Sequence, residues 1–342
     1  MAAKKQVNIT QVAKAAGVST QTVSRVINNR PDVAPATRLR VQRVIEQVNY
    51  RPNILARSLI HRRSNTIGVV AMASSYYGPS NTLVGIEKMI RNLGYSLLLD
   101  FMHHPERDDV ELIINRLLSH QVDGILWAIP EIGNNRAWLQ RQNAHLPIPV
   151  IYLSMEPRAG LPVVAIDNRS GASLATEHLL HKGFHNIGLI AGPPDWWEAR
   201  QRQAGWKGAL HRAGLPADER QIVAGDWSAA SGEACIRSLW EQFSDMDAVF
   251  VGNDQMALGV LQAAHRSGRR VPQDLAVVGF DNIPESRYFW PGLTTIDQPL
   301  IELGGRAVQA LSGRIEAEYN DEHPAQTGSL LLKPTLVVRD SS

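Results

Sequence analysis

The sequence predicts an α/β protein with a small helical module at its N-terminus and two similar doubly wound subdomains behind it. Three observations support this prediction. Short helical patterns fill the first 50 residues, apolar runs alternate with amphipathic segments from residue 64 onward, and two of those runs recur after 120 and 124 residues. A chain of 342 residues with 44% apolar content can also bury more than one sizeable core.

The N-terminal module contains the segment ITQVAKAAGVSTQTVSRVIN, residues 9–28. Its apolar positions follow the 3.6-residue period of a helix, and Gly17 lies where a first helix can end in a left-handed turn. Ser19 can cap a second helix that is apolar on one side and polar on the other. This order is typical of a DNA-reading helix-turn-helix, although a small surface helical hairpin would give the same spacing.

The next segments complete a headpiece and a hinge. Residues 31–50 predict a third helix that closes a three-helix bundle over residues 1–50. In residues 51–63, Asn53 can cap about two helical turns of apolar and cationic residues. Isolated helices shorter than ~12–15 residues are marginal in water, so we expect this hinge helix to form only when it docks.

Charge separates the two parts of the chain. Residues 1–63 hold twelve Lys and Arg against two Asp and Glu, a net charge of +10, and the remaining 279 residues carry a net charge of −8. The whole-chain value of +2 therefore hides a strongly basic head. Such an asymmetry is the electrostatic footprint of phosphate binding.

The larger part of the chain reads as parallel βαβ units. Its predicted strands are 66–72, 95–101, 122–128, 149–154, 186–192, 221–226, 247–252 and 275–280. The segment NTIGVVA is similar to HNIGLIA, and VDGILWA is similar to MDAVFVG. This internal similarity indicates two similar subdomains. We expect an effector-binding and dimerisation domain over 64–342, with its boundaries at about 64–162 plus 296–324 for the first subdomain and 163–295 plus 325–340 for the second.

Polar residues follow several of the predicted strand ends, where open α/β sheets bind ligands. Asn253, Asp281 and Gln298 each follow an apolar run, Trp227 closes another, and Arg202 lies near a helix start. Each one alone could be a cap, a solvated helix residue or a lid over the core. Together they favour a polyhydroxylated ligand, because charged and amide groups can bind paired hydroxyls while an indole covers a sugar ring.

The segments ITQVAKAAGVSTQTVSRVIN and VNYRPNILARSL closely resemble the headpiece and hinge of the LacI/GalR (lactose-repressor) family of bacterial transcription regulators. The motifs IAGPP, ARQRQAGW, FVGNDQMALG, VVGFDN and LTTIDQPL extend the resemblance into a periplasmic-binding-protein-like core of the lactose-repressor type. It implies base contacts in the major groove, phosphate contacts and a minor-groove wedge, Leu59. The implied DNA-binding residues are Thr20, Gln21, Arg25, Asn28, Thr37, Asn53, Ala56, Arg57 and Leu59.

The same resemblance implies a sugar effector between the subdomains. The implied contacts are Arg202, Trp227, Asn253, Asp281, Gln298, Tyr76, Tyr77 and Ser154. Met72, Ala128 and Ser154 stand where lactose-repressor-type members carry polar groups, so a pyranose site is implied without a particular sugar. The implied function is repression of sugar-utilisation genes by a homodimer that a galactoside- or glucoside-like sugar releases from a pseudo-palindromic operator. A co-repressed regulator and a sugar carrier of the periplasmic-binding type are the alternatives.

Other classes fit the sequence poorly. It contains no GxxxxGK[ST], HExxH or GxSxG motif, so we expect neither an enzyme nor a resident cofactor or metal. Cys235 is the only cysteine, which excludes an intramolecular disulfide. A polar helix follows MAAKKQVN in place of an apolar signal segment, so we expect a cytoplasmic protein.

Overall fold

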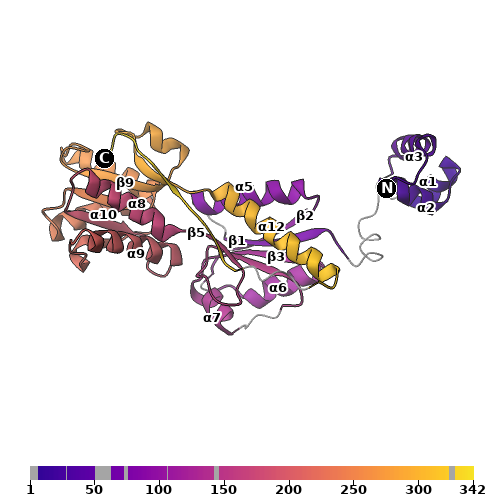
Figure 1. The fold of residues 1–342 in the computed structure, drawn as a ribbon, viewed down its shortest axis with the longest axis horizontal. Helices are drawn as coiled ribbons and strands as arrows, with labels where there is room; N and C mark the ends of the chain where they lie inside the picture. The colour runs from indigo at the N-terminus through magenta and orange to yellow at the C-terminus, as the bar shows by residue number, and fades with distance from the viewer. Residues whose placement is uncertain are drawn as a thin grey trace, which may run out of the picture. The chain divides into compact units, whose positions relative to one another are not determined.

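The computed structural model describes residues 7–27, 29–50, 63–72, 76–105, 107–141, 146–322 and 328–342. The chain forms two compact units, residues 1–64 and residues 65–342 (Figure 1). Each is considered by itself below.

The first unit is a bundle of three helices, α1 (Ile9–Ala16), α2 (Thr20–Ile27) and α3 (Pro35–Gln47). Asn8 and Gln11 form a capping box that starts α1, and Gly17 ends it with a φ of 62°. The backbone N–H of Thr22 donates to Ser19 Oγ at 3.1 Å, which starts α2. The predicted helix-turn-helix is confirmed, while most of the predicted hinge, residues 51–62, lies outside the described residues.

The second unit contains two six-stranded sheets. The first has the order β11-β5-β4-β3-β1-β2 and the second β12-β10-β9-β8-β6-β7. The strands of the first sheet are β1 (Thr66–Met72), β2 (Ser96–Met102), β3 (Gly124–Ala128), β4 (Val150–Leu153), β5 (Val163–Ile166) and β11 (Leu330–Leu332). Those of the second are β6 (Ile187–Ala191), β7 (Ile222–Ala224), β8 (Ala248–Val251), β9 (Ala276–Asp281), β10 (Thr294–Asp297) and β12 (Thr335–Val337).

The repeat seen in the sequence corresponds to equivalent places in the two sheets. β1 and β6 hold the same position in their sheets, and so do β3 and β8. All pairs are parallel except the antiparallel pair β10–β12. All eight strands predicted from apolar runs are present, and the prediction of two similar α/β subdomains is confirmed.

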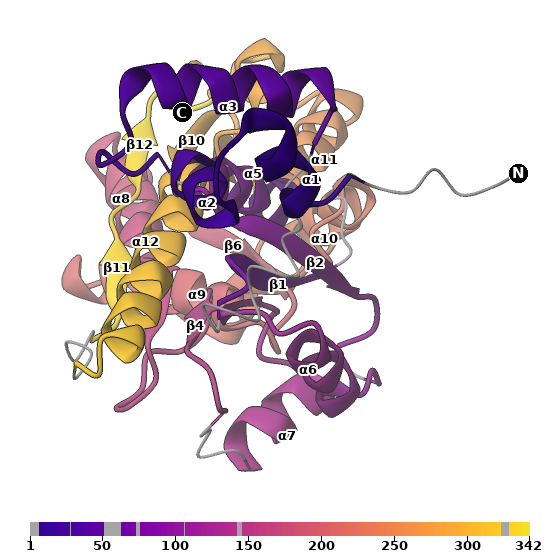
Figure 2. The ribbon, with the colours of Figure 1, turned by 90° about the vertical axis from the view of Figure 1, so that its right-hand side faces the viewer.

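Helices cover both faces of each sheet, because successive strand residues point to opposite faces and both are apolar. The helices of the first subdomain are α5 (Tyr77–Asn92), α6 (Val110–Ser119), α7 (Gly133–Arg141) and α12 (Leu300–Tyr319). Those of the second are α8 (Asn168–His181), α9 (Trp197–Arg212), α10 (Ala229–Gln242) and α11 (Asp254–Arg266), with the short turns η1 (Glu219–Gln221) and η2 (Pro284–Tyr288). Figure 2 shows α6 and α7 together below β1 and β2.

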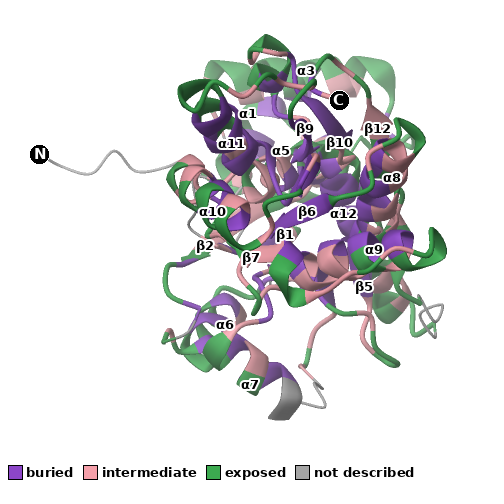
Figure 3. Cartoon of the chain, turned by 90° about the vertical axis from the view of Figure 1, so that its left-hand side faces the viewer, coloured by how far each residue is buried: buried purple, intermediate pink, exposed green. Residues whose placement is uncertain are grey.

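Neighbouring strand residues show how the core is divided. Val69 and Leu126 pack in the cluster beneath α5 and α12, whereas Val70 and Trp127 pack in the cluster of α6 and α7. Figure 3 shows the strands β6, β9 and β10 as buried, with exposed turns on the surrounding helices. Doubly wound packing of this kind leaves the carboxyl ends of the strands free to build a site.

The subdomain boundaries differ from those expected. β5 (Val163–Ile166) pairs with β4 in the first sheet, and β10 (Thr294–Asp297) stays in the second, so the chain crosses near Asp167 and again near Gln298. β5 was not among the predicted strands, and its pairing with β4 and β11 places it in the first sheet. The third crossing lies between β11 and β12, where Pro334 interrupts the apolar run and lacks the N–H that a continuous strand would use.

Candidate functional site

The first unit presents a polar helix face. Thr20, Gln21 and Arg25 on α2 are exposed, and Thr37 on the first turn of α3 is half-buried. Arg25 Nη1 lies 3.4 Å from Asp32 Oδ2, and both side chains are about half exposed. Such a pair contributes little to stability, so the guanidinium is available to another acceptor. Asn28, Asn53, Ala56, Arg57 and Leu59 lie outside the described residues.

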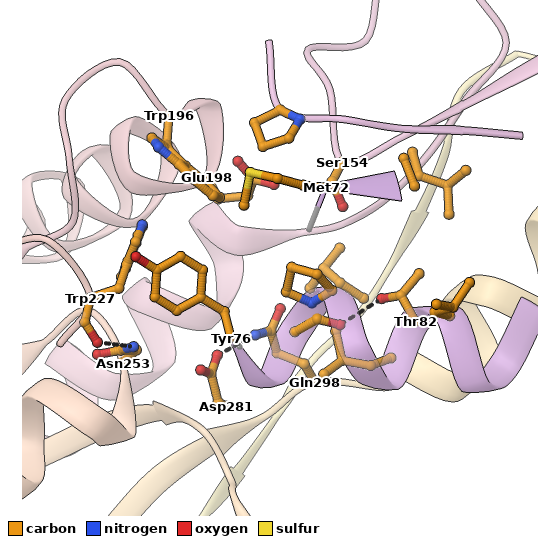
Figure 4. Close-up of a pocket in the computed structure, with 18 of the residues that line it drawn as sticks. Met72, Tyr76, Thr82, Ser154, Trp196, Glu198, Trp227, Asn253, Asp281 and Gln298 are labelled. Carbon is orange, nitrogen blue, oxygen red and sulfur yellow. Dashed lines mark hydrogen bonds between the residues drawn. The ribbon is translucent and has the colours of Figure 1, made fainter. Parts of the chain in front are cut away.

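The second unit contains a pocket between its two subdomains (Figure 4). Its volume is about 970 Å³ including the open mouth. Half of its polar lining comes from the carboxyl ends of the parallel strands. These residues are Ser154 after β4, Asn168 after β5, Trp227 after β7, Asn253 after β8, Asp281 at the end of β9 and Gln298 after β10.

Arg202 is the central cation of this pocket. Its side chain is buried, and its Nε donates to Asn168 Oδ1 at 2.8 Å while Nη1 donates to the Gly252 carbonyl. Nη1 also lies 3.9 Å from Asp281 Oδ1. The guanidinium carbon stands 3.8 Å from the centre of the Phe280 ring, a cation–π contact. These partners hold the guanidinium in one orientation.

Asp281 provides the matching carboxylate. Its Oδ1 accepts a hydrogen bond from Gln298 Nε2. Burial raises the pKa of Asp281 to about 6, although Arg202 and the Gln298 hydrogen bond both act to lower it. A carboxylate of that pKa is mostly ionised at neutral pH and can accept ligand hydroxyls.

Asn253 has a structural role in addition to lining the pocket. Its Oδ1 accepts the backbone N–H of Met256 at 2.9 Å and so caps α11, and its Nδ2 donates to the Trp227 carbonyl at 3.0 Å. The amide therefore holds the start of α11 and the loop after β7 together. Asp254 beside it faces away from the pocket and accepts from Thr295 Oγ1 and the backbone N–H of Ile283.

Three aromatic rings form one wall of the pocket. Tyr76 and Trp196 meet edge to face with ring centres 6.3 Å apart, and Trp196 meets Trp227 in the same way at 5.9 Å. The Tyr76 hydroxyl donates to the Asp226 carbonyl at 3.2 Å. Since Tyr76 precedes α5 and Asp226 follows β7, this hydrogen bond joins the two subdomains across the pocket.

Tyr77 does not line the pocket. It begins α5 and packs against the core of the first subdomain. Tyr76, the extended N-cap residue of α5, lines the pocket. The expectation that Tyr77 also stacks on a ligand stays a prediction, and the pocket lining does not include that residue.

Backbone strain marks the same place. Ser154, Trp227 and Asp281 have φ values of 54°, 75° and 121°, in the region that non-glycine residues rarely adopt. All three line the pocket. Strained residues of this kind cluster at ligand sites, where surrounding contacts fix them in place.

Comparison with known proteins identifies the chain. Residues 8–53 match the model of bacterial regulatory proteins of the lacI family, and residues 176–342 match the periplasmic binding protein-like domain. The ribose operon repressor of Escherichia coli K12 is 37% identical over 335 residues, which cover 97% of this chain and 98% of that protein. The chain belongs to the LacI family of bacterial transcription regulators.

Other relatives agree with this assignment. Catabolite control protein A of Priestia megaterium is 34% identical, over 94% of this chain and 96% of that protein. The crystal structure of the lac repressor dimer bound to operator and the anti-inducer ONPF superposes with a TM-score of 0.84 at 32% identity, covering 98% of this chain and 99% of that one. LacI-family repressors with a sugar-binding type of core are thus its relatives along the whole chain, and the periplasmic carrier alternative is not favoured.

Seven of the eight predicted effector residues meet at this one pocket: Ser154, Arg202, Trp227, Asn253, Asp281, Gln298 and Tyr76. Met72 and Ala128, which the family resemblance implied as lining positions, line it too. Sequence reasoning missed Asn168, Trp196 and Glu198. Asn168 follows β5, the strand that was not predicted, and the other two lie in the segment PPDWWEAR, where α9 begins.

The described residues contain no helix long and apolar enough to cross a membrane.

Proposed function

We propose that this LacI-family protein is a homodimeric repressor that a saccharide, galactoside- or glucoside-like, releases from a pseudo-palindromic operator. The observation that supports this proposal is the pocket of the second unit, which is lined by a cation, a carboxylate, amides and an aromatic wall. Apolar walls with a few placed polar groups are typical of sites for small ligands. Paired hydroxyls and a flat ring face are what this combination recognises.

Two atoms of the pocket wall support a hydroxyl-rich ligand. Within the part of the chain that the structure describes, Glu198 Oε2 and Trp227 Nε1 are buried with no hydrogen-bond partner. One is an acceptor and the other a donor, and a buried polar atom without a partner costs about 1–3 kcal/mol. A saccharide offers both kinds of partner, because each hydroxyl donates and accepts.

The headpiece supports a DNA partner. Thr20 and Gln21 occupy the first turn of α2, the part of a recognition helix that contacts base edges. Their exposure and the net charge of +10 over residues 1–63 suit a helix that enters the major groove of a polyanion. The base and phosphate contacts assigned to Thr20, Gln21, Arg25, Asn28 and Thr37 are part of this proposal, as are the hinge contacts of Asn53, Ala56, Arg57 and Leu59.

Exposed apolar side chains support the homodimer. Trp290 and Tyr288, beside η2, are 93% and 80% exposed, and Val84 on α5 and Leu258 on α11 are 53% and 42% exposed. Aromatic residues of this size are enriched in protein interfaces. Both subdomains thus carry apolar groups that a second copy of the chain can cover.

In this mechanism the saccharide acts by selecting one arrangement of the subdomains. The chain crosses between the sheets three times, and Tyr76 bridges the pocket to Asp226, so the ligand contacts both moving parts. Release requires that the saccharide bind the DNA-incompetent state more tightly, and ~100-fold selectivity corresponds to about 2.7 kcal/mol.

A thermal-shift panel tests the effector. Glucose, galactose, ribose, lactose and cellobiose are added to the full chain, and we expect at least one to raise the Tm, because a ligand that binds only the folded state stabilises it. Asp274→Asn, on an exposed carboxylate that pairs with Arg270, is the control and should respond like the parent. A panel without any shift would contradict the sugar effector while leaving the family assignment intact.

A further inference from the structure

Glu198 is a pocket carboxyl with one oxygen, Oε2, that no described hydrogen bond uses. It occupies the first turn of α9, and Figure 4 shows it at the same end of the pocket as Met72 and Trp196. Its Oε2 is buried and has no hydrogen-bond partner among the described residues. A carboxyl oxygen in that position needs a hydrogen-bonding partner that a ligand can supply.

The charged groups around it are committed elsewhere. Arg202, one turn further along α9, is held by Asn168, the Gly252 carbonyl and Asp281. Arg200 donates to the carbonyls of Pro194 and Asp195.

Glu131 lies outside the pocket lining. It forms an ion pair with Arg158, and Arg136 donates to the Glu131 carbonyl. The charged lining of the described pocket therefore consists of one paired cation, Arg202, and two carboxyls, Asp281 and Glu198.

We propose that Glu198 is a specificity-determining residue, which selects an uncharged saccharide and rejects anionic counterparts such as uronic acids and sugar phosphates. The inference rests on the proposed function and narrows its ligand class. A hydroxyl can donate to the Glu198 carboxylate, whereas a ligand anion placed there meets a like charge in a site of low dielectric.

The pKa of Glu198 agrees with this role. Burial raises it to about 7, while a hydrogen bond from the residue's own backbone N–H, Arg202 and Arg200 act to lower it and Glu131 acts to raise it further. A ligand anion beside Glu198 would raise this pKa again, so its binding favours the protonated carboxyl. A test at pH 8 therefore examines the ionised carboxyl.

The test compares matched neutral and anionic sugars on the full chain at pH 8 by titration calorimetry. The pairs are glucose with glucuronate, galactose with galacturonate, and cellobiose with its uronate. We expect the parent to bind at least one neutral sugar and to bind the matching uronate at least ~10-fold more weakly. Glu198→Gln keeps the shape and removes the charge, so it should narrow the ratio of neutral-sugar affinity to uronate affinity to within about threefold, whatever it does to the neutral affinity itself.

Glu156→Gln is the control, because that carboxylate is half exposed and does not line the pocket. The Glu156→Gln variant should keep the parent's ratio of neutral-sugar affinity to uronate affinity. Equal binding of a neutral sugar and its uronate by the parent, or an unchanged ratio in a folded Glu198→Gln variant, would overturn the inference and leave the sugar-responsive function standing. Binding of no sugar at all would instead overturn the proposed function and the inference with it.

Discussion

Replacing Asp281 with asparagine removes one charge from the pocket and little else. The new side chain has the same shape, and its amide oxygen can still accept from Gln298 Nε2. Arg202 keeps Asn168 and the Gly252 carbonyl as acceptors. Asparagine also tolerates a positive φ, as the value of 121° at this position requires. The variant should therefore fold with an intact pocket.

The expected loss is confined to the saccharide. A hydrogen bond to a charged acceptor is worth about 1.5–3 kcal/mol, and each 1.4 kcal/mol is tenfold in affinity. Asp281→Asn should thus weaken saccharide binding by roughly 10- to 150-fold. Arg202→Ala is a poorer probe, because it removes the whole side chain together with its hydrogen bonds to Asn168 and the Gly252 carbonyl, so the loss of a sugar contact could not be separated from damage to the pocket.

Calorimetry with the panel sugar that binds the parent measures this loss, and fluorescence anisotropy measures operator binding. Operator affinity without sugar should match the parent, because the headpiece is a separate compact unit. Asp274→Asn is the matched control. Parent-like sugar affinity in Asp281→Asn would refute the assignment of this carboxylate to the effector.

Three further perturbations separate the parts of the account. Leu59→Ala should weaken operator binding and leave sugar affinity unchanged, because an apolar wedge acts only in the minor groove; unfolding of the larger unit would contradict this. Trp290→Asp should raise the dimer dissociation constant at least ~10-fold in sedimentation, since it puts a charge on a ring that is 93% exposed; a parent-like mass would argue against this interface. Glu198→Gln should have a higher denaturant midpoint of unfolding than the parent. The difference in midpoint should grow from pH 4.5 to about 7 and then stay constant, because a pKa raised in the folded state lowers the parent's free energy of unfolding over that pH range. A difference that does not change with pH would contradict this prediction.

Much of the architecture could be predicted because local signals and packing agree. β1 was predicted at its observed bounds, and the capped pair of short helices gave the helix-turn-helix. β5 was missed because it follows β4 closely along the chain, and its pairing with β4 and β11 makes it a strand. The apolar run around Pro334 forms two strands, β11 in the first sheet and β12 in the second. Hydropathy alone cannot predict this division, because it depends on tertiary packing.

The site was predictable where a residue follows a strand. Asn253, Asp281 and Gln298 each end an apolar run, and parallel strands bring such ends to one edge. Glu198 and Trp196 have no such marker, since they precede or begin a helix whose direction depends on packing. The separation of Tyr76 from Tyr77 likewise depends on where α5 begins.

Operator release by a saccharide tests the central claim most directly. A labelled duplex that the full chain selects from a random pool is titrated with the protein, with and without a saturating panel sugar that raises the Tm. We predict that the sugar raises the dissociation constant for this duplex at least ~10-fold for the parent, and that Asp281→Asn needs roughly 10- to 150-fold more sugar for the same rise. An unchanged or tighter complex of the parent in the presence of the bound sugar would contradict the account.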